Sequence, residues 1–497
     1  MTEQRDQSGA PGSLALLTDL YELTMAYGYW KRNMLDTEGV FHLTFRSNPF
    51  DGGYAIAGGL APVLDALERF RFDSHDLEYL AGLRGNDDHP LFEEAFLNYL
   101  LELRLECDID AIPEGTPVFA HEPLLRVSGP ILHAQILETL LLNLINFQTL
   151  IATKASRVVR AAKGDRVVEF GLRRAQGVDG GLAASRAAYL GGCSGTSNVL
   201  AGKMYGIPVN GTQAHSWVMA FDSELEAFEA YAEAMGNNVI LLVDTYDSLQ
   251  GVRHAVEVGR NLRERGHRLA GIRLDSGDLA WLSKAARAIL DDAGFPDTLI
   301  AASNEFDEYV VESLKQQGAE ITLWGVGTRL VTGHDQPALG GVYKLSAVRR
   351  PGGTWQSRIK LSEHVSKTSN PGILQVRRFD RGGKLVGDMI YDTESPPGDT
   401  PLMIDPLDVT RRKRLPADAE WENLLINVIR RGERVYDPPP LEESRARVFR
   451  ELERLDEGIL RFLNPHEYPV GLEENLHRRK TELILSRKRN GRKGELK

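Results

Sequence analysis

Residues 165–221 read GDRVVEFGLRRAQGVDGGLAASRAAYLGGCSGTSNVLAGKMYGIPVNGTQAHSWVMAF and contain two apolar, strand-like runs. The run at 167–170 opens onto Arg173, and the run at 207–209 opens onto a polar turn that contains His215. Polar side chains that follow buried strands often gather at one edge of a sheet, where ligands bind. This stretch therefore predicts both a strand-based fold and a binding site.

The turn GGCSGTS, residues 191–197, lies between these two runs. Small residues let backbone N–H groups approach a ligand closely, and a helix that follows adds a positive dipole end suited to phosphate or carboxylate. We interpret the turn as an anion-binding element. The alternative is that Phe170 is a core residue, that the arginines are solvated, and that His215 is simply one of 12 histidines.

From residue 166 onward, apolar runs alternate with helical patterns. The runs end at Phe170, Val209, Val243, Leu274, Ala302 and Trp324, and the helical patterns cover 223–235, 248–264, 279–292 and 305–316. Such alternation predicts a parallel sheet with right-handed crossovers, either doubly wound or closed as a barrel. Because six strands are fewer than the eight of an ideal barrel, we expect an α/β fold with an irregular (β/α) barrel.

Polar residues and glycines follow these strands. They are Arg173, Gln213, His215, Asp244, Asp247, Arg273, Asp275, Asp278, Ser303, Asn304, Gly325, Gly327 and Thr328. In a barrel they would share the carboxyl face, where phosphate commonly binds the last strand loops, here GVGT at 325–328. Asp278 is expected to cap the following helix, whereas Asp275 is either a second cap or, as we favour, a ligand-binding carboxylate.

The flanking regions predict further domains. We expect a disordered N-terminus at 1–13, a mixed α/β domain at 14–130, the barrel domain at 131–345 and a C-terminal region at 346–497 that packs near the N-terminal domain. In the N-terminal domain, Asp19 and Glu22 have the spacing of a capping box for a helix at 14–30. In the C-terminal region, a hairpin is expected to turn at 381–383.

Bulk properties exclude several classes of protein. The chain has 497 residues, 42% of them hydrophobic, so it can bury a large core. A net charge of −11 argues against a nucleic-acid footprint over the whole surface, and Cys107 and Cys193 lack metal-binding spacing. Neither a signal peptide nor an apolar run of about 18 residues is evident, so we expect a cytoplasmic protein. The tail at 477–497 has nine Lys or Arg against two Glu, consistent with a solvated helix end or with a basic interaction tail.

Several motifs occur together in a fixed order. They are LLTDLYELTMAYGYW, EFGLRR, GGCSGTSNVLAG, GIPVNGTQAHSW, VDTYDS, RLDSGDL, GVGTRLVT and GGVYKL, with NPHEYPVGL near the end. In this order the chain resembles the nicotinate phosphoribosyltransferase family over residues 14 to 380. The resemblance implies transfer of phosphoribosyl from phosphoribosyl pyrophosphate (PRPP) to nicotinate, giving nicotinate mononucleotide and pyrophosphate, coupled to ATP hydrolysis.

The resemblance also implies roles for individual residues. His215 matches the histidine that the family phosphorylates, and Phe170 matches its base-stacking aromatic residue. Tyr21 resembles an aromatic residue that the neighbouring subunit contributes, which implies at least a homodimer. Ser197 stands where the nicotinamide-using relatives have an aspartate, although Ser197 could instead cap the helix that follows.

The chemistry of the reaction suggests the remaining roles. Arg173 can neutralise phosphate by bidentate contact, and Arg273 is a cationic donor for the nicotinate carboxylate. Asp275 can accept from ribose hydroxyls or help to hold Mg²⁺ through the diphosphate, and Asp244 is expected to orient His215. The candidates for the PRPP 5′-phosphate are Ser303, Asn304, Gly325, Gly327 and Thr328.

Other functions stay open at this point. A sugar-phosphate aldolase would need a Schiff-base lysine inside a strand, but Lys203 lies in a helical pattern and Lys344 follows the repeat. A scaffold protein would not need so many polar groups at its strand ends. Within the family, a nicotinamide-using or quinolinate-using enzyme is the alternative.

Overall fold

The computed structural model describes residues 13–362, 368–398 and 401–494. The chain divides into two compact units. The first unit comprises residues 1–149, 339–440 and 450–497, and the second comprises 150–338 and 441–449. The expected disordered N-terminus at 1–13 lies outside the described residues apart from Ser13.

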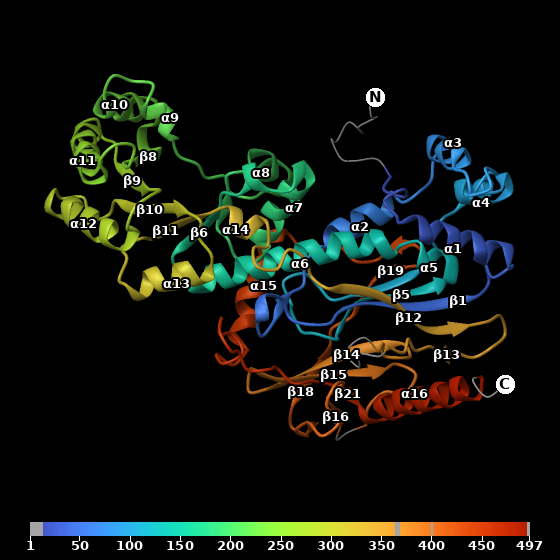
Figure 1. Cartoon of the computed structure of the whole chain (residues 1–497). Coiled ribbons are helices and arrows are strands. Elements are labelled where there is room, and N and C mark those ends of the chain that lie inside the picture. The colour runs from blue at the N-terminus through green and yellow to red at the C-terminus, as the bar shows by residue number, and fades with distance from the viewer. Residues whose placement is uncertain (1–12, 363–367, 399–400, 495–497) are drawn as a thin grey trace. The chain divides into compact units, whose positions relative to one another are not determined.

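The second unit is built on a six-stranded parallel sheet (Figure 1). In spatial order the strands are β7 (Gly195–Thr196), β6 (Arg166–Glu169), β11 (Leu323–Val326), β10 (Leu299–Asn304), β9 (Leu269–Leu274) and β8 (Val239–Leu242). The sheet curls into a half-barrel, which confirms the expected irregular barrel. No pairing joins β7 to β8 among the described residues, so the sheet stays open on that side.

One expected strand is much reduced. Residues 207–209 contribute only an isolated parallel bridge between Thr196 and Val209. The reason lies in the neighbouring residues: Pro208 has no N–H to donate, and its carbonyl accepts from the N–H of Thr196. The chain therefore touches the sheet edge once and then leaves as a loop toward His215.

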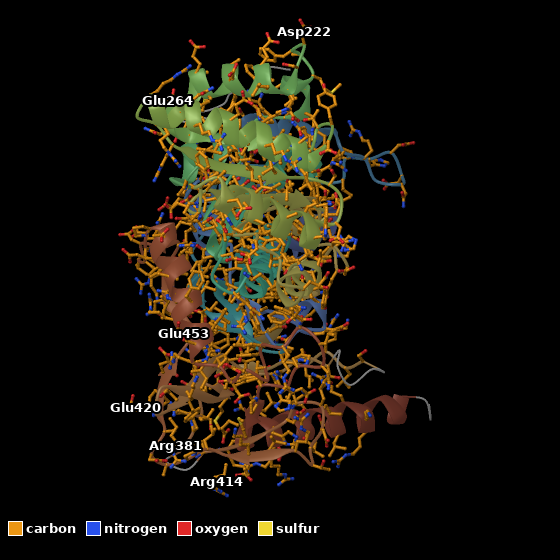
Figure 2. All side chains as sticks on the ribbon, turned by 90° about the vertical axis from the view of Figure 1, so that its left-hand side faces the viewer. Asp222, Glu264, Arg381, Arg414, Glu420 and Glu453 are labelled. Atoms are coloured by element: carbon orange, nitrogen blue, oxygen red, sulfur yellow. The ribbon has the colours of Figure 1, made fainter. Side chains whose placement is uncertain are left out.

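Helices connect the strands of the second unit. They are α6 (Glu138–Ala161), which enters from the first unit, α7 (Gly177–Leu190), α8 (Val199–Tyr205), α9 (His215–Val218), α10 (Glu224–Met235), α11 (Ser248–Glu264), α12 (Leu279–Asp292), α13 (Glu308–Gln316), α14 (Thr328–Val331) and the start of α15 (Leu441–Glu453), with 3₁₀ turns η2 (Leu172–Arg174) and η3 (Gly236–Asn238). Asp247, Asp278 and Asp307 cap three of them by accepting from backbone N–H groups. Charged residues such as Asp222 and Glu264 point outward (Figure 2).

The first unit contains two larger sheets and a small one. The first has the order β13 (Gln356–Ser357), β12 (Gly341–Arg349), β1 (Glu38–Phe45), β5 (Pro123–Pro130), β3 (Asp108–Ala111), β19 (Ile426–Arg430), β20 (Glu433–Arg434). The second has the order β17 (Arg412–Arg414), β16 (Leu402–Ile404), β21 (Val470–Glu473), β15 (Lys384–Asp392), β14 (Leu374–Arg381), β18 (Glu420–Asn423); β2 (Ala55–Ile56) pairs with β4 (Pro117–Val118). Because β19 pairs with β3, the C-terminal extension packs on the N-terminal strands as expected. The expected hairpin is present as β14 and β15.

The remaining elements of the first unit are helical: α1 (Leu20–Lys31), η1 (Pro49–Asp51), α2 (Leu60–Glu68), α3 (Ser74–Gly82), α4 (Glu94–Glu102), α5 (Ile131–Gln135) and α16 (Glu474–Gly494). The expected capping box of α1 is wrong, because Asp19 makes no side-chain cap. Glu22 is buried instead and accepts from the Thr139 N–H at 3.0 Å. A capping box is present at α3, formed by Asp73 and Asp76.

One segment is long and apolar enough to cross a membrane by length and composition alone, Ile131–Ala161. In its most apolar window 61% is buried within the structure. That burial is typical of a core helix in a globular protein.

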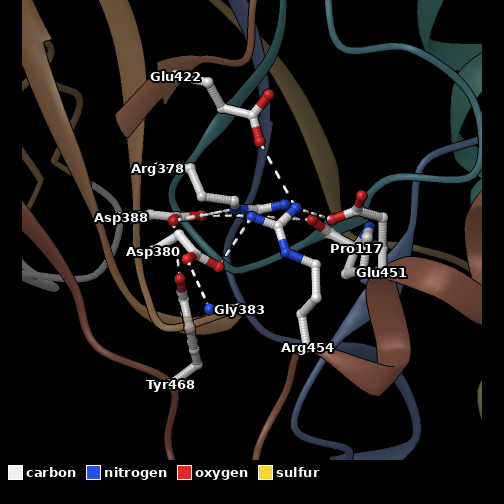
Figure 3. Close-up of polar contacts among 9 residues, drawn as sticks. All are labelled: Pro117, Arg378, Asp380, Gly383, Asp388, Glu422, Glu451, Arg454 and Tyr468. Carbon is white, nitrogen blue, oxygen red and sulfur yellow. Dashed lines mark hydrogen bonds and ion pairs between the residues drawn. The ribbon is translucent and has the colours of Figure 1, made fainter. Parts of the chain in front are cut away.

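A buried charge cluster joins β14 and β15 (Figure 3). The Arg378 guanidinium donates to the Asp388 carboxylate at 2.6 Å and to the Pro117 carbonyl at 2.8 Å. The Tyr468 hydroxyl donates to Asp388 at 2.8 Å, and the Glu122 carboxyl group lies beside it. Because all of these groups are buried, we assign the cluster a structural role: it holds the hairpin to the β4–β5 region.

Candidate active site

His215 is the first residue of α9 and lies at the carboxyl edge of the parallel sheet. Its Nδ1 is 3.2 Å from the Thr245 hydroxyl, and its Nε2 is 3.8 Å from the Asp275 carboxylate. The expected contact with Asp244 is not formed. The orienting group beside His215 is therefore Thr245, the residue that directly follows Asp244 in the sequence.

Asp244 instead supports the loop that carries Asp275. Its Oδ2 accepts from the Asp275 N–H at 2.8 Å and from the Ser276 hydroxyl at 2.7 Å, while Oδ1 is buried without a partner among the described residues. The Asp275 carboxylate accepts from the Ser303 hydroxyl and is 39% exposed. Asp275 therefore joins the ends of β8, β9 and β10 and keeps an accessible face. The expected cap of α12 is Asp278, so Asp275 is not needed as a cap.

Two arginines, Arg173 and Arg273, are close enough for their charges to interact. Arg273, on β9, donates to the Thr212 hydroxyl, and its Nε is buried without a partner in the described structure. Burial lowers the pKa of Arg273, the carboxylates of Asp275 and Asp244 oppose this shift, and the neighbouring positive charge of Arg173 adds to it. A buried guanidinium with an unpartnered Nε and a second cation nearby suits an anionic ligand.

Phe170 lies directly on β11. A Cβ atom on Gly325 would come 2.5 Å from Phe170 Cδ2 and 3.3 Å from Ser303 Cβ. Only glycine leaves room for the ring at this place, so the Phe170 ring packs directly on Gly325. The sequence predicted Gly325 as a phosphate-binding residue and did not predict this contact.

The ends of β10 and β11 form a second polar group. The side-chain oxygen of Asn304 accepts from the Glu305 N–H at 2.7 Å, and the Thr328 hydroxyl donates to the Glu305 carboxylate at 3.0 Å. Gly327 is the N-cap of the short helix α14, and its carbonyl accepts from Leu330. The predicted phosphate residues are thus close together, but Glu305 adds an acidic group that the sequence reasoning did not consider.

The turn GGCSGTS does not present its amides to a ligand. The N–H groups of residues 191–194, 196 and 197 all donate to backbone carbonyl oxygens of the second unit, at 2.7 to 3.0 Å. The interpretation of this turn as an amide cradle for anions is therefore wrong. The glycines serve close packing instead, since a Cβ on Gly191 would come 2.2 Å from the Ala152 carbonyl oxygen.

Ser197 is held next to Phe170 through the backbone. The Ser197 N–H donates to the Glu169 carbonyl at 2.9 Å, and the N-cap of α8 is Asn198, which accepts from the Ala201 N–H. The Glu169 carboxylate is fully buried and accepts from Gly171 N–H and from the Thr196 hydroxyl at 2.5 Å. Ser197 is thus not the helix cap, which removes the structural alternative for this residue.

Tyr21 belongs to α1 in the first unit, whereas the other predicted site residues belong to the second. Its side chain is 46% exposed, and its pKa is raised by partial burial and by the nearby carboxylate of Glu138. The sequence reasoning missed Thr245, Glu169 and Glu305. Each directly adjoins a predicted residue, so the neighbours of a strand-end motif were the signal that could have found them.

The fold and these strand-end groups define a half-barrel enzyme scaffold suited to anionic substrates. Three family models match the chain in order: the nicotinate phosphoribosyltransferase (NAPRTase) N-terminal domain at residues 16–146, the NAPRTase family at 166–350 and the C-terminal domain at 375–480. The chain is 41% identical over 478 residues to a nicotinate phosphoribosyltransferase of Bacillus subtilis, covering 95% of each chain. It is 46% identical over 401 residues to one of Mycobacterium tuberculosis, covering 80% of this chain and 83% of the relative.

Solved structures agree. The structure of human nicotinic acid phosphoribosyltransferase superposes with a TM-score of 0.82 at 34% identity, covering 94% of this chain and 99% of the human one. A nicotinate-nucleotide pyrophosphorylase from Pyrococcus furiosus shares the fold, with a TM-score of 0.67 at 22% identity, covering 88% and 95% of the two chains. The chain belongs to the nicotinate phosphoribosyltransferase family.

Proposed function

We propose that this protein transfers the phosphoribosyl group of PRPP to nicotinate, as a step of NAD biosynthesis. The ring nitrogen of nicotinate bonds to C1 of the ribose, the bond from C1 to the diphosphate oxygen breaks, and pyrophosphate leaves. The observation that carries the proposal is the strand-end edge at which Asp275 lies 3.8 Å from His215 and Arg273 keeps a buried Nε without a partner in the described structure, with the positive charge of Arg173 close enough to act on Arg273. Two cations suit the diphosphate and the substrate carboxylate, while Asp275 can accept from ribose hydroxyls and favour positive charge at the sugar.

His215 is proposed to couple ATP hydrolysis to the transfer. Thr245 holds Nδ1, which leaves Nε2 to attack the γ-phosphate of ATP; ADP leaves, and water later releases orthophosphate from the phosphohistidine. The phosphorylated side chain would then add negative charge beside Asp275 and change how the edge binds PRPP.

Mg²⁺ fits this site only as a partner of the diphosphate. No group of three or more metal-ligating side chains is present among the described residues, so a bound Mg²⁺ would take most of its oxygen ligands from the substrate and water. Asp275 is the protein carboxylate placed to join them. When bound, the ion would neutralise charge on the leaving diphosphate.

Nicotinate rather than nicotinamide is the proposed base. Ser197 offers a neutral hydroxyl, and its N–H is bonded to the carbonyl of Glu169, the residue before Phe170. An aspartate at this place would repel the nicotinate carboxylate. The alternative, a nicotinamide phosphoribosyltransferase, is tested by supplying PRPP with nicotinate, nicotinamide or quinolinate, each with and without ATP. Nucleotide formed from nicotinamide alone would overturn the assignment.

The test of ATP coupling is His215→Ala. We expect it to abolish ATP hydrolysis and to leave a slow, ATP-independent transfer, because the ribosyl chemistry uses the arginines and Asp275. Loss of orthophosphate release, measured beside nucleotide formation, separates the two activities. A variant that hydrolyses ATP at the parent rate would remove His215 from the mechanism.

We further propose a cytoplasmic homodimer in which Tyr21 completes the site of the neighbouring subunit. Tyr21→Ala and Arg273→Ala, each inactive alone, should regain partial activity when refolded together, since one mixed site would then be intact. If verified heterodimers show no recovery, Tyr21 does not act across subunits.

A further inference from the structure

Nine residues of the C-terminal region, 441–449, belong to the second unit. They form the start of α15, and from it Arg445 reaches the turn that precedes Ser197. Arg445 Nε donates to the Cys193 carbonyl at 3.0 Å, and Nη2 donates to the Gly192 carbonyl at 3.1 Å. One guanidinium thus holds two consecutive carbonyl groups.

The same two peptide units are also held from the other side. The N–H of Cys193 donates to the Ala188 carbonyl at 3.0 Å, and the N–H of Ser194 donates to the Val167 carbonyl at 2.7 Å. In a planar peptide unit the N–H and C=O groups point in opposite directions. Helix α7, strand β6 and Arg445 together therefore fix the orientation of both peptide planes, and only Arg445 comes from outside the strand-end motifs.

Neighbouring side chains hold the Arg445 guanidinium in position. Its guanidinium lies 5.2 Å from the Tyr189 ring and 5.3 Å from the Phe449 ring, and Nη1 is 3.2 Å from the Glu442 carboxylate. Glu442 also accepts from the Tyr189 hydroxyl. A lysine ammonium is a single point charge and could not bridge both carbonyls in this way.

Gly192 makes this approach feasible. Its φ is +117°, and a Cβ atom would come 3.1 Å from Phe449 Cζ. The absence of a side chain at Gly192 therefore lets Phe449 of α15 pack closely against the turn. After it the chain continues through β7 to Ser197, whose N–H is fixed to Glu169 beside Phe170.

We propose that Arg445 is a positioning residue for the base pocket: it fixes the turn at 192–194 and thereby the place of Ser197. This inference rests on the proposed function, because Ser197 is taken as a neighbour of the nicotinate carboxylate. It assigns the C-terminal region a part in substrate recognition that neither the strand-end motifs nor the fold alone suggests.

The test uses the full-length protein with Arg445→Met, Arg445→Lys and, as the matched control, Arg450→Met, which changes an exposed arginine of the same helix. We expect both Arg445 variants to raise the KM for nicotinate about tenfold, since small misplacements of a binding group are costly, with kcat and the KM for PRPP nearly unchanged. Arg450→Met should match the parent.

A second measurement does not depend on activity. Amide hydrogen exchange should speed up in the peptide that spans 191–198 in both Arg445 variants and stay unchanged in Arg450→Met. Unchanged exchange at 191–198 would overturn the proposed hold on the turn. Faster exchange with an unchanged KM for nicotinate would overturn the link to the base pocket, whereas a parent enzyme that forms no nucleotide from nicotinate would instead refute the proposed function.

Discussion

Asp275 and Asp388 are both carboxylates in polar clusters, yet their surroundings differ. Asp388 is fully buried and accepts from Arg378 and Tyr468 in a cluster that we call closed because all of its groups are buried (Figure 3). Even there, Arg378 Nη1 and Glu122 Oε1 have no hydrogen-bond partner in the described structure. Asp275 is 39% exposed and lies 3.8 Å from His215, and the neighbouring Asp244 keeps a buried oxygen without a partner in the described structure. The difference that matters is access: the Asp388 carboxylate is paired with a cation away from solvent, whereas a ligand can reach the Asp275 carboxylate.

The largest effect should come from opening the closed cluster. Arg378→Met leaves the Asp388 carboxylate and the Glu122 carboxyl group buried without a cation, so we expect a loss of about 3–5 kcal/mol in the free energy of unfolding. Urea-induced unfolding measures the loss. Arg381→Met on the same hairpin removes an exposed ion pair with Asp418 and should cost less than about 1 kcal/mol. Equal losses in the two variants would contradict the comparison.

Asp275→Asn should have the opposite pattern, with a small effect on stability and a large effect on activity. It keeps the shape but removes the charge of a group that is not part of a closed cluster, so the free energy of unfolding should change by less than about 1 kcal/mol. The value of kcat/KM for nucleotide formation should fall by at least about 100-fold, because charge stabilisation at the sugar is lost. Asp278→Asn is the control, since asparagine caps a helix about as well as aspartate. Parent activity in Asp275→Asn would remove this residue from the site.

Ser197→Asp tests whether Ser197 helps the site to select nicotinate over nicotinamide. We expect kcat/KM for nicotinate to fall by about 100-fold, or about 2.7 kcal/mol in transition-state binding, while use of nicotinamide is unchanged or rises. Because Asn198 caps α8, a loss of helix capping cannot explain such a change. Steady-state kinetics with both bases give the answer, and equal nicotinate kinetics in a folded variant would exclude Ser197 from recognition.

The smallest predicted effect is a pH dependence of stability in the closed cluster. Burial raises the pKa of Glu122 well above its ordinary value, and the nearby Asp388 carboxylate adds to the shift. The folded protein therefore binds this proton more tightly than the unfolded chain does. The stabilisation is complete below the unfolded pKa of about 4.3 and is lost as pH rises through the higher folded pKa, at up to about 1.4 kcal/mol per pH unit.

Glu122→Gln tests whether Glu122 causes this pH dependence of stability. Thermal or urea unfolding across pH 4 to pH 8 should show a shallower decline in stability for Glu122→Gln than for the parent, because the amide cannot ionise. The exposed Glu420→Gln should retain the parent profile (Figure 2). Parallel profiles for Glu122→Gln and the parent would mean that Glu122 does not titrate in the folded protein over this range.

Much of the second unit was predictable from local pattern. The helices at 248–264 and 279–292 match their predicted bounds, and the strand ends were placed within a few residues, because burial imposes a regular apolar period on each element. The resemblance on eight ordered motifs, with a further one near the end, led to the family that the comparisons show. The strand expected at 207–209 is only an isolated bridge in the structure, since an apolar run alone does not reveal that Pro208 weakens the pairing.

The sequence by itself determined which groups stand at the strand ends, because the order of strands and helices in a parallel sheet brings those ends to one edge. Only the tertiary structure decided which of these groups meet: Thr245 rather than Asp244 beside His215, Gly325 under Phe170, and Arg445 on the carbonyls of the GGCSGTS turn. The reason is physical. Local patterns record whether a residue is buried, but hydrogen bonds between residues as far apart as Arg445 and Gly192, which are 253 positions apart, depend on packing that no local period encodes.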